Sequence, residues 1–511
     1  MEEQVVEVKQ EEEKKETKPG VSQKTFFKNI VIVLISNIIS MVAGVLIGFI
    51  IPKIMGVTEY GYYKTFTLYS SYIGILHFGF IDGIYLKFAG KRYEDLDKEK
   101  FRTYFKFLFG LELAASILVL GVSFIFFKTN YFWIILFVAI NILATNITTY
   151  YELISQIMMK FKRTTARNII RCSLNIVSVL TLYFLYRFND VTIYNYYYVI
   201  ITLSVNYLLA VWYMITYRDI TFGKSKKIFE EKEAIGYFFK VGVPLLLSNL
   251  IGQIIYVVDQ QFVNIAFDND TYAVYAFAYN MINLITVATS AISTVLYPTL
   301  KRMNEETIKD NYSRINAYLL MFVAFCLIAY FPLFLIVTHF LPKYNGSLPT
   351  FLVILPGVLI SSSISVIKYN CYKTFNKIIN YFIKSVIMLA VAIGADFAVY
   401  YIFGNTISIS IVSIAVLLVW YILVELYFIR AFKVHWVRNL LYILLILGGF
   451  YGLSTLHHYE KIHIALATSG YFLNFAIVTV LIYFGEIKRG ITSLKEKKKN
   501  KQQPVEVTEE Q

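Results

Sequence analysis

The chain of 511 residues is 57% hydrophobic and only 16% charged, and its mean hydropathy is +0.58. A soluble chain of this length could not bury so much apolar surface, so the composition excludes a soluble protein and indicates one that crosses a membrane several times. The net charge of +14 does not indicate a nucleic-acid partner, because the basic residues lie in short loops beside hydrophobic segments. There they orient the chain and attract anionic membrane lipid.

Fourteen continuously apolar segments follow one another, each near the roughly 20 residues that a helix needs to cross a hydrocarbon core. The spans are predicted, in chain order, at residues 29–51, 62–86, 107–127, 131–153, 169–187, 194–217, 241–265, 272–297, 315–337, 348–367, 384–403, 407–429, 439–456 and 462–485. Because no segment alternates with a period of two, helices are indicated rather than strands. The predicted fold is an all-α integral membrane protein with about 14 transmembrane helices.

Lysine and arginine concentrate in every second gap between these spans. When residues near span ends are counted with the adjacent gap, 29 lie in even-numbered gaps and 6 in odd-numbered gaps, and the two tails hold 13. The positive-inside rule therefore places the even gaps and both termini in the cytoplasm. The tails at residues 1–24 and 488–511 are rich in Lys, Glu and Gln, and we expect them to be disordered.

A weak internal repeat relates the two parts of the chain. Residues 59–63 (EYGYY) align with 271–275 (TYAVY) at an offset of 212, and residues 161–163 (FKR) align with 375–377 (FNK) at an offset of 214. Chance matches in a Tyr-rich chain are the alternative. The repeat predicts two six-span halves of the same orientation, related by an axis along the membrane normal. The predicted parts are an N-terminal bundle at 25–218, a cytoplasmic linker at 219–240, a C-terminal bundle at 241–430 and two added helices at 431–487.

Polar side chains follow one face of predicted spans 7 and 8, at steps of three and four residues. Turned to lipid, amides and hydroxyls would be left unsatisfied, so this face meets either another helix or a wet cavity. The number of such groups favours the cavity. The candidate substrate-binding residues are Asn249, Gln253, Tyr256, Gln260, Tyr279, Asn283, Thr286 and Ser290.

Acids inside predicted spans form a second set of candidates, because an unpaired charge there costs several kcal/mol. Glu112 lies in span 3, Asp259 in span 7 and Asp396 in span 11. Each is a candidate for ion coupling, with an internal ion pair as the alternative. No metal-ligand pattern is present, since the three cysteines are far apart, and no cofactor is expected.

Several stretches resemble Wzx-type polysaccharide flippases. In the first half these are IPKIMGVTEYGYYKTFTLY (51–69) and FGFIDGIYLKFAGKR (78–92). In the second half, FKVGVPLLLSNLIGQIIYVVDQQFVNIAF (239–267) and YPTLKRMN (297–304) resemble the family's Gly-x-Pro, its Asp in span 7 and its Tyr-Pro at the end of span 8. The resemblance covers roughly residues 25–430. It implies the multidrug/oligosaccharidyl-lipid/polysaccharide (MOP) exporter superfamily, with two MATE-like bundles.

The resemblance further implies that the protein flips an undecaprenyl-diphosphate-linked oligosaccharide across the bacterial plasma membrane, for capsule, exopolysaccharide or O-antigen synthesis. A polysaccharide polymerase or glycosyltransferases would then be its partners. Four cations near the cytoplasmic membrane face become candidates for contact with the pyrophosphate, although snorkelling anchors are the alternative. They are Lys87, Arg171, Lys368 and Lys384.

Other functions are weighed against this one. A cation-coupled multidrug antiporter of the same superfamily would use Asp259 as its coupling acid, but the long basic loops argue against it. A lipid II flippase is disfavoured because no arginine lies deep in a predicted span. A membrane enzyme would need larger outer loops than the predicted gaps of about a dozen residues or fewer. A nucleotide-driven pump is disfavoured because it would need a Gly-rich phosphate loop with Lys-Ser/Thr, and the sequence has no such motif.

Overall fold

The computed structural model describes residues 23–88, 93–158, 161–301, 303–433 and 436–502. Over these ranges the chain is helical, apart from turns and a single parallel bridge between Met55 and Ile193. The prediction of an all-α fold is therefore confirmed for the described residues. Most of the predicted N-terminal tail (1–24) and the end of the predicted C-terminal tail lie outside them.

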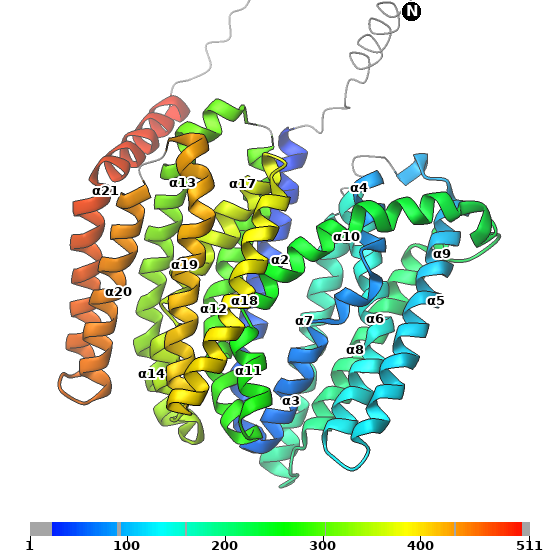
Figure 1. The fold of residues 1–511 in the computed structure, drawn as a ribbon, viewed down its shortest axis with the longest axis horizontal. Coiled ribbons are helices and arrows are strands. Elements are labelled where there is room, and N and C mark those ends of the chain that lie inside the picture. Colours follow the sequence, from blue (N-terminus) through cyan, green and yellow to red (C-terminus); the bar gives the residue numbers. More distant parts are fainter. Residues whose placement is uncertain (1–22, 89–92, 159–160, 302, 434–435, 503–511) are drawn as a thin grey trace, which may run out of the picture.

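The first part of the chain forms a group of helices on the right of Figure 1, except that its first helix lies in the centre, between α7 (Phe161–Phe188) and α12 (Asn269–Leu300). These helices are α2 (Gln23–Ile54), α3 (Val57–Ser70), α4 (Phe80–Phe88), α5 (Lys98–Ser123), α6 (Tyr131–Ile157), α7 (Phe161–Phe188), α8 (Asn195–Thr216) and α9 (Arg218–Thr221). Short 3-10 turns lie at Ile73–His77, Tyr93–Asp95 and Phe124–Phe126. Asp97 fixes the start of α5, because its carboxylate accepts hydrogen bonds from the amides of Glu99 and Lys100.

The second part forms a group in the centre and on the left of Figure 1, shown in green to orange, except that its first helix lies on the right, across α4. Its helices are α10 (Lys232–Ile255), α11 (Val258–Ala266), α12 (Asn269–Leu300), α13 (Glu305–Cys326), α14 (Tyr330–Phe340), α15 (Ser347–Ile354), α16 (Gly357–Ser362), a π-helical turn (Ser363–Lys368), α17 (Tyr369–Thr374), α18 (Ile378–Phe403) and α19 (Thr406–Phe432). Short 3-10 turns lie at Ile228–Glu231, Leu327–Ala329 and Pro342–Tyr344.

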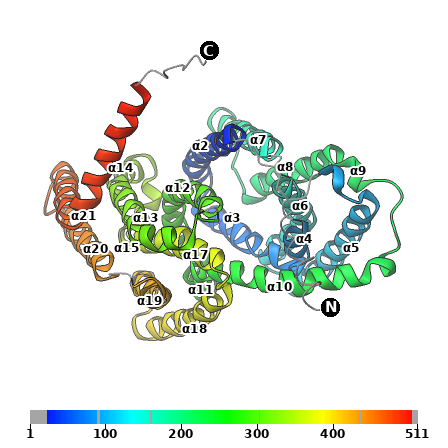
Figure 2. The ribbon, with the colours of Figure 1, turned by 90° about the horizontal axis from the view of Figure 1, so that it is seen from above.

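Two further helices, α20 (Trp436–His458) and α21 (Ile464–Gln502), pack against each other and against α13 at one edge of the molecule (Figure 2). A helix is thus present where the predicted span 439–456 lies. Helix α21 bends at Tyr483, whose φ of −117° is not helical, and then runs past residue 488. The helix extends to Gln502, into the tail for which we expect disorder, and the Lys and Glu of this segment are strong helix formers.

Ten helices of the described residues are long and apolar enough to cross a membrane, or eleven if the pair Ser347–Ile354 and Gly357–Thr374, bent by 41°, is one span. These match predicted spans 3 to 6 and 9 to 14. Predicted span 7 (241–265) overlaps only the second half of Ile228–Ile255 and continues, after a break, into α11. Predicted span 8 corresponds to α12, and predicted span 1 to the end of α2, where Ile39–Ile54 forms a shorter apolar helix. The protein is a multi-pass integral membrane protein.

Predicted span 2 is not one helix, because the chain breaks between α3 and α4. Phe78 and Gly79 at the break have φ angles of 48° and 78°, in the left-handed region that favours glycine. There α4 crosses α10 closely: a Cβ added to Gly242 of α10 would lie 1.8 Å from the carbonyl oxygen of Gly79. The close approach of two backbones therefore accounts for the small residues and for the break.

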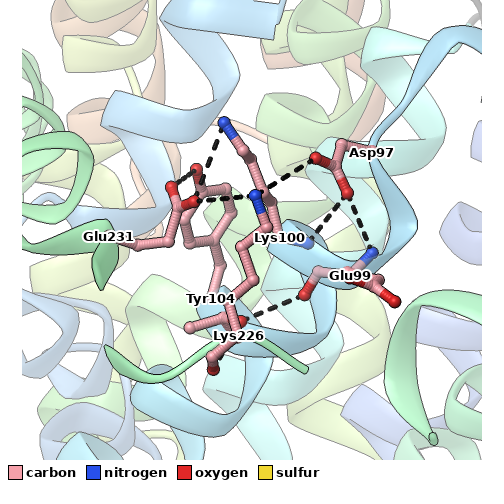
Figure 3. Close-up of polar contacts among 7 residues, drawn as sticks. Asp97, Glu99, Lys100, Tyr104, Lys226 and Glu231 are labelled. Atoms are coloured by element: carbon pink, nitrogen blue, oxygen red, sulfur yellow. Dashed lines mark hydrogen bonds and ion pairs between the residues drawn. The ribbon is translucent and has the colours of Figure 1, made fainter. Parts of the chain in front are cut away.

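The segment before α10 is tied to the first group by polar contacts at the start of α5. Figure 3 shows Glu231 facing Lys100, Tyr104 and Lys226. The Tyr104 hydroxyl donates to Glu231 Oε2 at 2.9 Å, and the two ammonium groups lie 3.7 and 3.8 Å from Glu231 Oε1. Helix α10 then runs across the molecule and packs on α4, whereas α11 packs on α12 and α18 (Figure 1). The chain thus passes from one group to the other within predicted span 7.

Candidate functional site

A cavity of about 380 Å³ lies within the second group of helices, between α12, α18, α19 and the junction of α10 with α11. Most of the surface exposed in it is apolar, and polar side chains from several helices are interspersed with it. Its polar lining residues are Tyr256, Asp259, Gln260, Tyr279, Asn283, Thr286, Thr289, Ser290, Ser293, Ser361, Ser362, Ser365, Asp396 and Ser413. A polar cavity inside a membrane protein can bind an ion or the polar part of a substrate, because its groups replace the lost water.

Asp259 lies on the wall of this cavity and is only 2% exposed. Its Oδ2 accepts hydrogen bonds from the Tyr275 hydroxyl at 2.7 Å, from the Tyr279 hydroxyl and from Ser413 Oγ at 3.1 Å. Its Oδ1 accepts from the amide of Gln260 at 2.8 Å. Three helices thus supply donors to one carboxylate, which is a strong preorganised arrangement for negative charge.

Asp396 of α18 lines the same cavity and is also 2% exposed. Its Oδ2 is buried and has no hydrogen-bond partner among the described residues. Neither Asp259 nor Asp396 forms an ion pair with a described lysine, arginine or histidine. Two acids on one wall with no counter-cation favour uptake of a proton or a small cation, since a charge on Asp396 in particular would have no donor at its Oδ2 among the described residues.

The break between α10 and α11 decides which residues of the predicted polar stripe reach this cavity. Helix α10 ends at Ile255, and Val257 has a non-helical φ of −130°. Tyr256 and Gln260, beside the break, line the cavity. Asn249 lies outside the lining and accepts a hydrogen bond from the Tyr369 hydroxyl, and Gln253 is exposed. The prediction treated span 7 as one straight helix. Because the helix is broken, the residues before and after the break face different directions.

The predicted polar face of span 8 is continuous, because α12 is a single helix of 32 residues. Tyr279, Asn283, Thr286 and Ser290 all lie on the cavity wall. Together with Tyr256 and Gln260, six of the eight candidate residues are brought to one place. Ser361, Ser362 and Ser365 also line the cavity and were absent from the predicted site, although this serine-rich run in predicted span 10 could have indicated another polar wall.

A smaller cavity of about 240 Å³ lies between the two groups, lined by α2, α3 and α12. It contains Lys64, whose Nζ donates to Asn280 Oδ1 at 3.2 Å. The same Nζ lies 5.3 and 5.8 Å from the ring centres of Tyr60 and Tyr63. No described carboxylate is within ion-pair distance of Lys64. Asn283 lines both cavities, so the two polar spaces adjoin along α12.

Lys64 was missing from the predicted cations. It stands at the third position of predicted span 2 and was therefore counted with the preceding gap. In the structure α3 begins at Val57, so Lys64 is in the middle of that helix. The signal that could have found it is a lysine flanked by aromatic residues on a polar, Tyr-rich segment.

The four predicted pyrophosphate contacts lie in separate places. Lys87 is exposed on α4, with its Nζ 5.1 Å from the ring centre of Tyr237 on α10. Arg171 is half-buried on α7, and Lys384 lies in a groove between α18 and α19. Lys368 is fully buried, and its Nζ is 3.1 Å from Glu425 Oε2. No cavity described for the chain is lined by two of these four side chains.

Glu112 is separated from the other two candidate coupling acids. It lies on α5 in the first group, is fully buried and accepts a hydrogen bond from Asn146 Nδ2 of α6 at 2.6 Å. The same amide group is 3.3 Å from the carbonyl oxygen of Ile73, at the break between α3 and α4. Asp259 and Asp396 therefore share a cavity, and Glu112 supports the broken span instead.

The comparisons with known proteins agree with this architecture. Residues 26–304 match the family model described as polysaccharide biosynthesis protein. Among solved structures, the lipid II flippase MurJ in an inward closed conformation is 13% identical, with 89% of this chain and 100% of that chain covered and a TM-score of 0.64. An inward-facing multidrug resistance MATE family transporter of the MOP superfamily is 14% identical, covering 82% of this chain and 97% of that chain, with a TM-score of 0.50. No curated protein matches the sequence significantly. At these identities the structural likeness shows the fold alone.

Proposed function

The chain belongs to the polysaccharide biosynthesis protein family, and from this we propose that it flips an undecaprenyl-diphosphate-linked oligosaccharide from the inner to the outer leaflet of the bacterial plasma membrane. Such a head group cannot cross hydrocarbon unaided, since burying unpaired charge and polar hydroxyls is prohibitive. The transporter supplies a polar path, and the lipid tail stays in the bilayer. The carried glycan would serve capsule, exopolysaccharide or O-antigen synthesis, beside a polymerase or glycosyltransferases.

The observation that carries this proposal is Lys64 in the cavity between the two groups of helices. An ammonium inside a membrane protein is expensive unless it has an anionic partner or water, and its described partners are an amide and two aromatic rings. Pyrophosphate would supply the missing negative charge, and lysine is a common phosphate ligand. Tyr63 beside it is half-buried and offers a ring on which a sugar can pack.

The amide and hydroxyl face of α12 would bind the sugars. Asn280 and Asn283 lie next to Lys64, and Tyr279, Thr286 and Ser290 continue into the larger cavity. In this proposal Lys64 replaces Lys368 as the deep phosphate contact, because Lys368 is enclosed with Glu425. Lys87 and Arg171 would attract the head group at the cytoplasmic face.

We further propose that the helices make fourteen spans in two six-span bundles (25–218 and 241–430), joined by the linker 219–240 and followed by the added pair 431–487. Both termini would be cytoplasmic, as the distribution of Lys and Arg indicates. The smaller cavity has walls from both bundles, so rocking of one bundle against the other would open it alternately to each side.

A cation-coupled multidrug antiporter is the second candidate, and Asp259 with Asp396 is the observation that favours it. In the flippase proposal the same pair couples transport to a gradient of protons or another small cation. The two functions differ in what Lys64 does, since a cationic drug would be repelled by an ammonium group and a pyrophosphate would be bound by it.

The test is a deletion strain complemented with variants, in which lipid-linked repeat units on the inner leaflet are measured. Lys64→Gln is expected to accumulate these units as the deletion does, Lys64→Arg to restore export, and Lys53→Gln to behave as wild type. Lys53 is a matched control because its Nζ bonds the Phe340 carbonyl oxygen outside the cavity. Normal export by Lys64→Gln, or drug sensitivity without accumulation in the deletion strain, would refute the flippase proposal.

A further inference from the structure

A groove of about 370 Å³ lies between α18 and α19, at the end where α18 begins and α19 finishes. It is lined by Asn380 and Lys384 of α18 and by Leu426, Tyr427, Arg430 and Ala431 of α19. The spacing of four residues places Asn380 and Lys384 on one face of α18, and the same spacing holds for Leu426 with Arg430 and for Tyr427 with Ala431. Two antiparallel helices thus turn a lysine and an arginine into one groove.

The two cations have unused hydrogen-bond donors. Lys384 Nζ donates to the Tyr372 hydroxyl at 3.0 Å, which leaves two of its three N–H groups without a described acceptor. The Tyr372 hydroxyl in turn donates to the Val424 carbonyl oxygen at 2.9 Å, so this chain of two hydrogen bonds positions the ammonium group of the lysine. The Arg430 guanidinium is exposed and has no hydrogen bond or ion pair to a described residue.

No described acid neutralises this pair. Glu305 at the start of α13 lies near Tyr427, but its carboxylate is paired with Lys309 at 3.8 Å. Two like charges that face one groove repel each other. A bound anion would remove this repulsion and supply acceptors for both groups.

The groove opens to the outside of the protein. Figure 2 shows α18 and α19 at the periphery, away from α2 and α3, and no groove residue lines either of the two polar cavities. Exposed apolar side chains continue from the groove along α18, with Ile383, Ile387 and Val391 about half exposed. The surface therefore joins a cationic head site to an apolar strip.

We propose that this groove binds the phosphate headgroup of an anionic phospholipid from the surrounding bilayer, of the phosphatidylglycerol class. The phosphate oxygens accept hydrogen bonds from Lys384 and Arg430, the headgroup hydroxyls meet Asn380 and Tyr427, and the acyl chains follow the apolar strip of α18. The site is separate from the transport cavities and does not rest on the identity of the cargo.

The test uses the purified full chain in detergent, titrated with short-chain phosphatidylglycerol or phosphatidylcholine, with bound lipid counted by native mass spectrometry. Phosphatidylglycerol is expected to bind preferentially. Since each basic residue near a membrane surface contributes about 1 kcal/mol, Lys384→Gln and Arg430→Gln should each weaken binding about fivefold and the double variant about thirtyfold.

Lys377→Gln is the matched control, because Lys377 is exposed at the start of the same helix but does not line the groove. It should bind as wild type, and Lys384→Arg should retain binding. The melting temperature of each variant in phosphatidylcholine identifies any variant that fails to fold. If Lys384→Gln fails to fold, Arg430→Gln is compared with Lys384→Arg instead. Equal binding of the two lipids, or full binding by the folded double variant, would overturn the proposal. Displacement by glycerol phosphate as readily as by lipid would show a free-phosphate site instead, and much tighter binding of a short prenyl diphosphate would show a cargo site.

Discussion

The buried pair Lys368–Glu425 gives a quantitative prediction, because both side chains are completely enclosed and their charged atoms lie 3.1 Å apart. Lys368→Met leaves a buried carboxylate with one remaining described donor, the Tyr312 hydroxyl at 2.7 Å. Removing one partner of a buried pair costs about 3–5 kcal/mol, and we expect that loss of stability here.

Glu425→Gln should cost less than Lys368→Met. The amide oxygen can still accept from Lys368, the ammonium keeps its hydrogen bond to Ser363 Oγ at 2.7 Å, and it lies 3.8 Å from the ring centre of Tyr421. A desolvated cation–π contact contributes about 2 kcal/mol, so the expected loss is roughly half that of Lys368→Met. The double variant has no buried charge and lacks only hydrogen bonds worth about 1 kcal/mol each. It should therefore be more stable than Lys368→Met alone.

The assay is the melting temperature of the purified wild type, both single variants and the double variant in one detergent. The melting temperature should be highest for the wild type, lower for the double variant and for Glu425→Gln, and lowest for Lys368→Met. If the two losses simply add in the double variant, the pair is not coupled and the reasoning is refuted. The cycle also tests the earlier hypothesis for Lys368: a stable double variant that still exports its substrate would exclude a contact between Lys368 and pyrophosphate.

Two further predictions follow from the cavity and from the crossing of α4 and α10. Asp259→Asn or Asp396→Asn should lower gradient-driven transport in proteoliposomes, and Glu112→Gln should have little effect, since Glu112 lies outside the cavity. An unchanged gradient dependence in both aspartate variants would contradict the coupling role. Gly242→Ala should reduce the yield of folded protein, because its Cβ would lie 1.8 Å from the Gly79 oxygen, whereas Gly236→Ala in the same helix meets nothing within 4 Å and should be tolerated; equal yields would show that the helices do not cross this closely.

Much of the fold could be predicted from the sequence, because the transfer of a 20-residue helix into hydrocarbon depends mainly on its own composition. The same local reasoning identified the polar face of α12, since a helix of 32 residues keeps side chains at steps of three and four on one side. It worked less well at α10 and α11, where a break near Val257 separates Asn249 and Gln253 from the cavity that Tyr256 and Gln260 line. Beyond the break α11 packs on α12 and α18, and such contacts between segments far apart in the chain lie outside any window of sequence.

Charged residues show the same division most clearly. The sequence alone established that Glu112, Asp259, Asp396 and Lys368 stand within or beside apolar segments and therefore need partners. Only the tertiary structure decided which partners they have: Asp259 and Asp396 share a cavity, Lys368 meets Glu425, and Lys64 lies between the two groups of helices. The physical reason is that the cost of an intramembrane charge is a property of one segment, whereas its compensation depends on side chains that come from helices far apart in the chain.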